Sequence, residues 1–445
     1  MSAQPPKPAQ ALLEPGPPRL LHAAPVNEAH AMAADFKPRS DLVRVLKERG
    51  HIYQATDIEA LDRAALEGVF TAYIGFDATA SSLHVGSLVQ IMTLRRLQQT
   101  GHRPIVLMGG GTTKVGDPSD KATQRPMLSD AEIAANLAGI RRAFAPFLTF
   151  GEGPTDAVMV NNAEWLEKLG YIEFLRDYGV HFTINKMLGL EFVRNRIENE
   201  QPLTFLEFNY MLMQSADFLE LNRRYDCTLQ FGGSEQWGNI VNGIDLIRRV
   251  EARAAFGVTA PLVTTASGVK MGKTVDGAVW LNAEMRSPYD YWQFWRNTED
   301  ADVGRFLRLF TDLPLSEIAR LEALQGAEIN EAKKMLAGEA TAMLHGREAA
   351  ETAAAAARAA FEEGRLSADL PTMEAPAAQI AAMSYADLML AAGFATSKGD
   401  ARRQIAGGAF RIDGVKVADA TALVALSGRE AELRKGNARK RLVVI

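Results

Sequence analysis

The sequence predicts an α/β protein with a doubly wound, mostly parallel sheet, followed by an α-helical region and a small α+β module. Short apolar runs alternate with helical patterns between residues 69 and 265, which is typical of strands and helices that alternate in a parallel sheet. The strand signals end near residue 287. A polar stretch with two prolines, at 364–381, then predicts a linker before the terminal module.

The first 38 residues predict a disordered extension, because they hold 8 of the chain's 19 prolines. They lack the continuous apolar core of a secretory signal and contain little Arg for a transit peptide. Ser40 is a suitable N-cap for a first helix at 41–50. Met32 lies just before that helix and is an alternative start of translation.

The parallel-sheet region is expected to contain five strands and five further helices. The strands are short apolar runs at 69–75, 104–108, 157–160, 227–231 and 262–265. The helices have apolar residues at helical spacing, at 83–100, 129–147, 163–178, 203–222 and 235–249. Helical patterns continue from 287 to 363. The terminal module, 382–445, contains two helical patterns, the second of them basic, and then short strands.

Composition is that of an ordinary globular protein, with 445 residues, 47% hydrophobic and 23% charged. This length predicts two to four domains. No apolar run approaches the roughly 18 residues that span a bilayer, so no membrane is expected. The single cysteine, Cys227, excludes an internal disulfide framework and the common cysteine-based metal sites. It fits a reducing, cytoplasmic location, and no metal site is expected.

The charge is unevenly distributed along the chain. Residues 384–445 carry 11 Lys+Arg against 6 Asp+Glu, a local charge of +5, whereas the net charge of the whole chain is −5. The remainder therefore carries −10. A basic end on an acidic body indicates a polyanionic partner held at that end.

Two short stretches suggest a nucleotide site. Residues 73–88, YIGFDATASSLHVGSL, indicate the end of a strand, a turn rich in small residues with His84, and the start of a helix. Phosphates bind at such junctions because free backbone N–H groups point at the anion. Residues 269–274, VKMGKT, place Lys270 and Lys273 in one loop, a spacing that suits a clamp on a polyphosphate.

A third pattern lies between them, in the helix TFLEFNYMLMQSADFLEL. Tyr210, Gln214 and Asp217 share one face of this helix, and most of their neighbours are apolar. Buried polar groups need partners. Spacing alone leaves two alternatives open, an internal hydrogen-bond network or the polar lining of a site for a small ligand with an amine and a hydroxyl.

In this order and spacing, the three patterns resemble bacterial tyrosyl-tRNA synthetases, a class I family, over roughly residues 41–445. The resemblance implies a Rossmann-like catalytic domain at 39–286, an α-helical anticodon-binding domain at 287–363 and a small RNA-binding domain at 382–445. It implies L-tyrosine, ATP with Mg²⁺ and tRNA(Tyr) as substrates, no tightly bound cofactor, and a homodimer. The alternatives are tryptophanyl-tRNA synthetase and a non-catalytic RNA-binding paralogue.

The resemblance also assigns residues to substrates. Tyr73 matches the tyrosine that hydrogen-bonds the substrate phenol, with Asp217 as its partner. The other residues that match the tyrosine pocket are Asp77, Asp117, Tyr210, Gln214 and Gln230. The residues that match the ATP site are Gly75, Thr79, His84, Gly86, Gly232, Glu235, Gln236 and Lys273.

The groups implied in catalysis are mainly cations around the departing pyrophosphate. They are His84, Ser87, Lys121, Arg125, Lys270, Lys273 and Thr274. Two positions depart from the family pattern, since Ser87 stands where the second histidine of HIGH is usual and Glu235 replaces the ribose-binding aspartate. Neither change removes a charge that the reaction needs. The RNA-facing cations implied for the terminal module are Lys398, Arg402, Arg403, Arg411 and Lys416.

Overall fold

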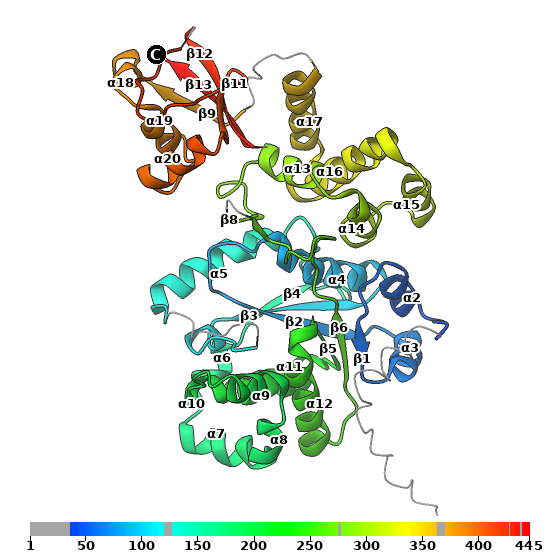
Figure 1. The fold of residues 1–445 in the computed structure, drawn as a ribbon. Helices are drawn as coiled ribbons and strands as arrows, with labels where there is room; N and C mark the ends of the chain where they lie inside the picture. Colours follow the sequence, from blue (N-terminus) through cyan, green and yellow to red (C-terminus); the bar gives the residue numbers. More distant parts are fainter. Residues whose placement is uncertain (1–35, 120–126, 275–276, 363–369, 427, 437) are drawn as a thin grey trace, which may run out of the picture.

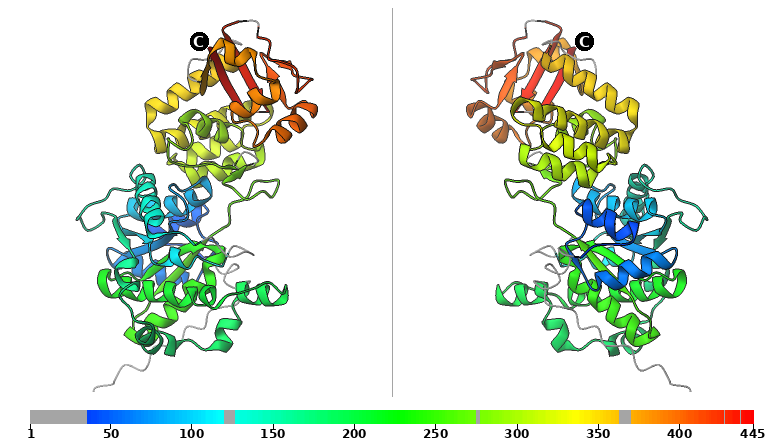
Figure 2. Two further views of the ribbon diagram at one scale, coloured as in Figure 1. Left: turned by 90° about the vertical axis from the view of Figure 1, so that its left-hand side faces the viewer. Right: turned by 90° about the vertical axis from the view of Figure 1, so that its right-hand side faces the viewer.

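The computed structural model describes residues 36–119, 127–274, 277–362, 370–426, 428–436 and 438–445. Figures 1 and 2 show a sheet-containing body, a helical domain attached to it and a smaller module beyond. The predicted extension, 1–38, lies outside the described residues except for 36–38, which form no helix or strand. Within these ranges, no helix is both long enough and apolar enough to cross a membrane.

The body is built on a six-stranded sheet in the order β1-β6-β5-β2-β3-β4. All neighbours pair in parallel except β1, which is antiparallel to β6. The predicted α/β class with a parallel sheet is therefore confirmed. The strands are β1 (Gln54–Ala55), β2 (Thr71–Asp77), β3 (Arg103–Gly109), β4 (Val158–Asn161), β5 (Leu229–Gly233) and β6 (Phe256–Ala260).

Helices cover both faces of this sheet (Figure 1). One face carries α4 (Leu88–Gln99) and α5 (Asp130–Phe144), and the other carries α11 (Tyr210–Tyr225) and α12 (Trp237–Glu251). The chain adds β3 and β4 on one side of β2, and then returns to add β5 and β6 on the other side. Such a switch point leaves a crevice at the strand ends. The remaining helices of the body are α2 (Asp41–Glu48), α3 (Ile58–Glu67), α6 (Ala163–Leu166), α7 (Tyr171–Asp177), α8 (Ile184–Leu188), α9 (Glu191–Glu198) and α10 (Phe205–Phe208).

Three expected elements differ from the structure, and one helix was not expected. The strand expected at 262–265 is wrong. The strand that enters the sheet in this part of the chain is β6, which ends at Ala260, and Thr264 forms only an isolated bridge with Lys270. The helix expected at 163–178 divides into α6 and α7 around Gly170, which is the N-cap of α7. The helix expected at 203–222 divides at Asn209 into α10 and α11. Helix α3, with Asp57 as its N-cap, was not predicted, although an acidic cap before an apolar period of three to four is a start signal.

The helical domain contains α13 (Pro288–Arg296), α14 (Val303–Phe310), α15 (Leu315–Glu322), α16 (Ile329–His345) and α17 (Arg347–Glu362). Its core is continuous with that of the body. An ion-pair cluster strengthens the junction: Arg96 of α4, 1% exposed, donates to Asp312, whose side chain is 36% exposed, and Arg95 donates to the same carboxylate at 2.5 Å. Helix α4, which follows the turn HVGS at residues 84–87 (the HVGS turn), is therefore held against the helical domain by these contacts.

The terminal module has a separate core and a five-stranded sheet in the order β11-β10-β12-β13-β9. The predicted linker at 364–381 is wrong for its second half, because β9 (Thr372–Ala375) pairs in parallel with β13 (Ala438–Val444). Proline rings at 371 and 376 flank this strand without removing a donor inside it. The other elements are α18 (Ala377–Ala381), α19 (Tyr385–Ala391), α20 (Lys398–Ala406), β10 (Phe410–Ile412), β11 (Val415–Lys416) and β12 (Glu430–Lys435).

Candidate active site

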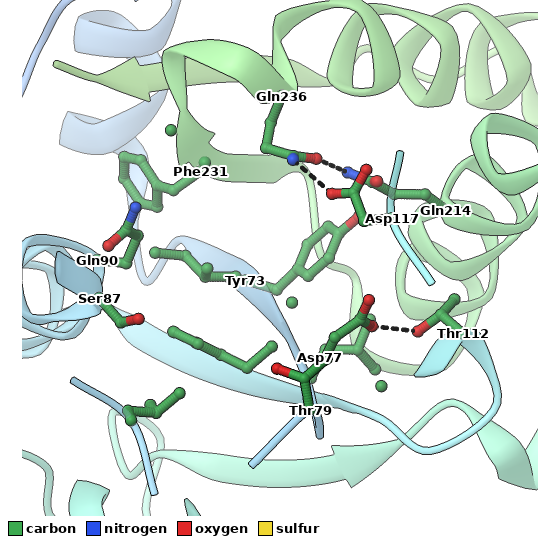
Figure 3. A pocket seen from close by; sticks show the side chains of 18 of the residues that line it. Tyr73, Asp77, Thr79, Ser87, Gln90, Thr112, Asp117, Gln214, Phe231 and Gln236 are labelled. Atoms are coloured by element: carbon green, nitrogen blue, oxygen red, sulfur yellow. Dashed lines mark hydrogen bonds between the residues drawn. The ribbon is translucent and has the colours of Figure 1, made fainter. Parts of the chain in front are cut away.

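A cavity of about 300 Å³ opens at the carboxyl ends of β2 and β5, at the switch point of the sheet (Figure 3). It collects predicted site residues that are up to 163 positions apart in the chain, from Tyr73 to Gln236. Those that line it are Tyr73, Gly75, Asp77, Thr79, His84, Ser87, Asp117, Tyr210, Gln214, Asp217, Gln230, Gly232, Glu235 and Gln236. Gly86 and Lys270 line an adjoining cavity that shares His84, Ser87 and Glu235 with the first.

The innermost part of the cavity is a buried pair of polar side chains. Tyr73 is 1% exposed and Asp217 is 2% exposed. The Tyr73 hydroxyl has no hydrogen-bond partner among the described residues. Burial raises the pKa of the Tyr73 phenol, and the charge of Asp217 raises it further, so this hydroxyl stays protonated and available as a donor.

Asp217 is held by two donors that sequence reasoning missed. Trp165 donates its indole Nε1–H to Oδ1 at 2.8 Å, and Asn162 donates Nδ2–H to Oδ2 at 2.9 Å. Burial raises the pKa of Asp217 to about 7, and these two hydrogen bonds oppose the rise. The signal available in the sequence is weak: a tryptophan needs a partner for its N–H when buried, but its partner lies 52 positions away.

A second polar cluster lies on the α11 side of the cavity. Gln236 donates to Asp117 at 2.7 Å, Gln214 donates to Gln236 at 3.2 Å, and Asn239 donates to Gln214 at 3.0 Å. Figure 3 shows the first two of these bonds meeting at the side-chain amide of Gln236. The cluster presents one carboxylate and several amide oxygens, which suits a ligand ammonium group.

Tyr210 and Asp77 line the adjacent wall. The Tyr210 hydroxyl donates to Asp77 Oδ2 at 3.2 Å. Thr112, which was not predicted, donates to Asp77 Oδ1 at 2.8 Å (Figure 3). Burial raises the pKa of Tyr210 well above its ordinary value, with Asp77 as the next cause. Asp77 is therefore oriented from both sides, by one buried phenol and one hydroxyl.

The two sequence stretches that suggested a nucleotide site lie in contact. The segment that follows the second stretch pairs with the first, since Val85 N–H donates to the Val279 carbonyl at 2.9 Å and Leu281 N–H donates to the Leu83 carbonyl at 2.9 Å. Val279 N–H in turn donates to the Gly272 carbonyl of the second stretch at 3.1 Å. Gly86 needs to be glycine because a Cβ there would lie 2.6 Å from the His84 ring and 2.7 Å from the Met271 carbonyl oxygen. The HVGS turn and the VKMGKT loop thus form one wall.

His84 has a defined tautomer in this wall. The backbone N–H of Gly86 donates to His84 Nδ1 at 3.0 Å, which in the neutral ring places the proton on Nε2. A neutral imidazole with Nε2–H is a hydrogen-bond donor to a phosphate oxygen. Ser87, half-buried at the N-terminus of α4, lines the same cavity.

Glu235 follows β5 in the loop GGSEQWGN. A Cβ on Gly233 would lie 2.3 Å from Glu235 Oε1, so the carboxylate folds back over that glycine. The extra methylene is therefore accommodated by bending toward the backbone. Gly232 is equally constrained, since a Cβ there would lie 2.9 Å from the Gln236 side chain.

Other predicted residues lie elsewhere. Lys121 and Arg125 lie outside the described residues, and Lys273 and Thr274 form β7, which pairs with β8 (Gly277–Ala278). The predicted RNA-facing cations are all exposed, on α20, β10 and β11 of the terminal module. Among the described residues, no group of three or more His, Cys, Asp or Glu side chains could hold a metal ion.

Comparison with known proteins gives one consistent result. The family model for "tRNA synthetases class I (W and Y)" matches residues 65–362. The chain is 64% identical over 405 residues to the tyrosine–tRNA ligase of Caulobacter sp. (strain K31), covering 91% of this chain and 95% of that relative. It is 59% identical to that of Zymomonas mobilis over 89% of this chain and 97% of the relative.

A solved structure is also similar. The C-terminally truncated mitochondrial tyrosyl-tRNA synthetase of Aspergillus nidulans superposes with a TM-score of 0.65 at 30% identity. The superposition covers 76% of this chain and 98% of that chain.

Proposed function

The chain belongs to the tyrosine–tRNA ligase family of class I tRNA synthetases, and we propose that its cavity joins L-tyrosine to ATP and then to tRNA. In the first step the tyrosine carboxylate attacks the α-phosphorus of ATP, which forms tyrosyl-adenylate and releases pyrophosphate. In the second step a ribose hydroxyl at the 3′ end of tRNA(Tyr) attacks the carbonyl carbon of the adenylate, which transfers the tyrosyl group and releases AMP.

The Tyr73–Asp217 pair is the observation that supports tyrosine as the substrate. A phenol placed at the inner end of the cavity would accept from the Tyr73 hydroxyl and donate to Asp217. Both protein groups are almost fully buried, so a ligand without the hydroxyl would leave the Tyr73 hydroxyl unsatisfied and would deprive Asp217 of one donor. Sites built in this way reject the deoxy analogue strongly.

The substrate ammonium group is assigned to the cluster on the α11 side. Asp117 supplies a negative charge, and Gln214, Gln230 and Tyr210 supply oxygen atoms around it. The buried Gln230 Oε1 has no hydrogen-bond partner among the described residues, so it is an acceptor for such a ligand. With the phenol at Asp217, the tyrosine carboxylate points toward the HVGS turn.

The chemistry of the first step needs positioning and charge stabilisation. A carboxylate is already ionised at pH 7, so it requires no general base to attack phosphorus. His84 Nε2–H and the lysines of the VKMGKT loop are the donors assigned to the phosphate oxygens, with Lys121 and Arg125 as further cations. Mg²⁺ accompanies ATP as part of the substrate, since this ion is usually bound through phosphates and waters with few protein ligands.

The adenosine part of ATP is assigned to Gly75, Thr79, Gly86 and the GGSEQWGN loop. The close approach of Gly86 to the Met271 carbonyl shows how little space a side chain would have here. Glu235 would accept from the ribose hydroxyls after turning away from Gly233.

The terminal module is assigned to tRNA. Its five exposed cations, Lys398, Arg402, Arg403, Arg411 and Lys416, would contact phosphates, and such contacts weaken steeply with salt. The helical domain is assigned to the anticodon region. The cytoplasm is the compartment where these substrates are consumed in translation.

A homodimer is supported by an apolar surface on the body. Large side chains are exposed along α7, the 3-10 turn Gly179–His181, α8 and α10, among them Ile172 (66%), Val180 (69%), Ile184 (60%) and Phe205 (67%). Patches of this kind are rare on monomers and typical of interfaces. Sedimentation of the full chain and of Phe205→Asp tests the assignment, with a shift to monomer expected for the variant.

ATP–pyrophosphate exchange tests the activity directly. We expect exchange with L-tyrosine and essentially none with tryptophan, phenylalanine or no amino acid. If tryptophan supported the fastest exchange, the substrate would be tryptophan and the proposal of tyrosine would be wrong. Absence of exchange with all of them, in a folded protein that binds tRNA, would favour a non-catalytic RNA-binding protein.

A further inference from the structure

The VKMGKT loop, residues 269–274, is called the lysine loop below. Its first residues form the second strand of a short hairpin, and the helical domain makes hydrogen bonds to this hairpin. Residues 263–265 fold back on 269–271, with Thr264 opposite Lys270 in an antiparallel bridge and Met271 N–H donating to the Val263 carbonyl at 2.9 Å. The tip is closed by Gly268 N–H, which donates to the Thr265 carbonyl at 2.9 Å. Lys270 is therefore placed by whatever holds Thr264 and the tip.

Two residues at the start of α14 hold this hairpin. Asp302 Oδ2 accepts from the backbone N–H of Ala266, at the tip, at 2.7 Å. Arg305 donates to the carbonyl oxygen of Thr264, directly opposite Lys270. The same guanidinium donates to Asp302 Oδ1 at 2.6 Å, so the two contacts form a single unit.

The surroundings of this unit make it rigid. Asp302 is only 3% exposed, and a buried carboxylate needs its full set of donors. One donor comes from the hairpin and the other from Arg305, so moving the hairpin would leave the carboxylate unsatisfied. Nearby, Ser267 Oγ donates to Glu299 Oε1 at 2.6 Å at the exposed tip.

We propose that Asp302 and Arg305 are positioning residues for Lys270, which fix the lysine loop against the HVGS turn for binding ATP. This inference rests on the proposed function, in which Lys270 contacts the phosphates. It assigns part of the ATP site to the helical domain, although neither residue lines the cavity. Neither Asp302 nor Arg305 is near the tyrosine end, so their effect is confined to the nucleotide side.

A matched pair of substitutions separates positioning from general stabilisation. Arg305→Met removes the donors and keeps the length of the side chain. The control is Arg308→Met, one turn further along α14, whose guanidinium pairs with Glu322 of α15 inside the helical domain. Asp302→Asn is a second variant, because its amide oxygen can still accept from Ala266 N–H while the ion pair is lost.

The readouts are the KM for ATP, the KM for tyrosine and the maximal rate of ATP–pyrophosphate exchange. For Arg305→Met we expect the KM for ATP to rise about tenfold, equivalent to about 1.4 kcal/mol and near the lower end for a hydrogen bond to a charged group. Asp302→Asn should also raise the KM for ATP. Neither should change the KM for tyrosine, and Arg308→Met should change neither constant by more than about twofold, the effect of an exposed ion pair.

Two results would overturn the inference. One is an unchanged KM for ATP in both Arg305→Met and Asp302→Asn. The other is a parallel rise in both KM values together with a lower melting temperature, which is the effect of a merely structural contact. Failure of the proposed function would look different, because the unmodified protein would then show no exchange that depends on tyrosine.

Discussion

Trp165→Phe is expected to change tyrosine binding in a way that depends strongly on pH. The substitution removes the Nε1–H that Trp165 donates to Asp217 Oδ1 at 2.8 Å and keeps an aromatic ring in the same place. Arg224, whose guanidinium lies 5.0 Å from the centre of the Trp165 ring, can still pack over the new ring. The substitution therefore removes one hydrogen bond to a buried carboxylate, and the smaller volume of the phenyl ring should affect binding equally at every pH.

The size of the effect follows from the pKa of Asp217, which burial raises to about 7. A hydrogen bond to a charged group contributes about 1.5–3 kcal/mol, and 1.36 kcal/mol corresponds to one pKa unit, so its loss should raise this pKa to about 8–9. The proposed bond from the substrate phenol needs the ionised carboxylate. At pH 7 the ionised fraction would fall from about one half to roughly 1–10%, and the KM for tyrosine would rise about 5- to 50-fold.

At pH 9 Asp217 is almost fully ionised in the unmodified protein and about one half to nine-tenths ionised in the variant, so the ratio of the two KM values should fall to about twofold or less. The assay is tyrosine-dependent ATP–pyrophosphate exchange at pH 7 and pH 9. Trp292→Phe is the control, because Trp292 is also buried but its Nε1 has no hydrogen-bond partner among the described residues. A ratio near one at pH 7, or one that stays the same at pH 9, would refute this account of Asp217.

Three further expectations concern other parts of the molecule. Tyr73→Phe should leave the melting temperature almost unchanged, because the hydroxyl makes no hydrogen bond within the described chain, and should raise the KM for tyrosine about 2- to 10-fold, the range for one neutral hydrogen bond. Hydrogen bonds and charge from Arg95 and Arg96 hold the pKa of Asp312 at about 2 although partial burial alone would raise it, so its contribution to stability is present above its unfolded pKa near 4 and is lost as the pH falls toward 2. The melting temperature of Asp312→Asn should therefore lie below that of the unmodified protein at pH 6, and thermal melts should show the difference shrinking by pH 2.5. A chain that ends at residue 369 should keep tyrosine-dependent exchange and lose most tRNA charging, whereas one that ends at 384 should aggregate, because it keeps β9 without its partner; equal loss of exchange and charging in the first would contradict the assignment of the module.

Local patterns in the sequence were sufficient for much of the fold. Strands β2 to β5 lie within about two residues of their expected positions, because each is a short apolar run bounded by turn residues. The strand expected at 262–265 failed for a physical reason. Both that run and 256–260 are apolar, and only pairing with β5 decides which one enters the sheet.

The site shows the same difference: residues within local motifs could be predicted, whereas interactions between distant segments could not. The residues that line the cavity were named from motifs that a family resemblance supplied, and their individual roles remain predictions. The partners that orient them could not be found, since Trp165 and Asp217, or Arg305 and Thr264, are brought together only by the tertiary fold. Hydrogen bonds between distant segments leave no periodic signal in a sequence.

The pairing of β9 with β13 has a consequence for the order in which the protein can fold during synthesis. β9 leaves the ribosome before the rest of the terminal module, yet its partner is made after all the other strands of that sheet. The body and the helical domain share a core that is complete by then, and domains generally fold in the order of their synthesis. A nascent chain that stops short of residue 438 would therefore carry a finished catalytic body and a module that is still open.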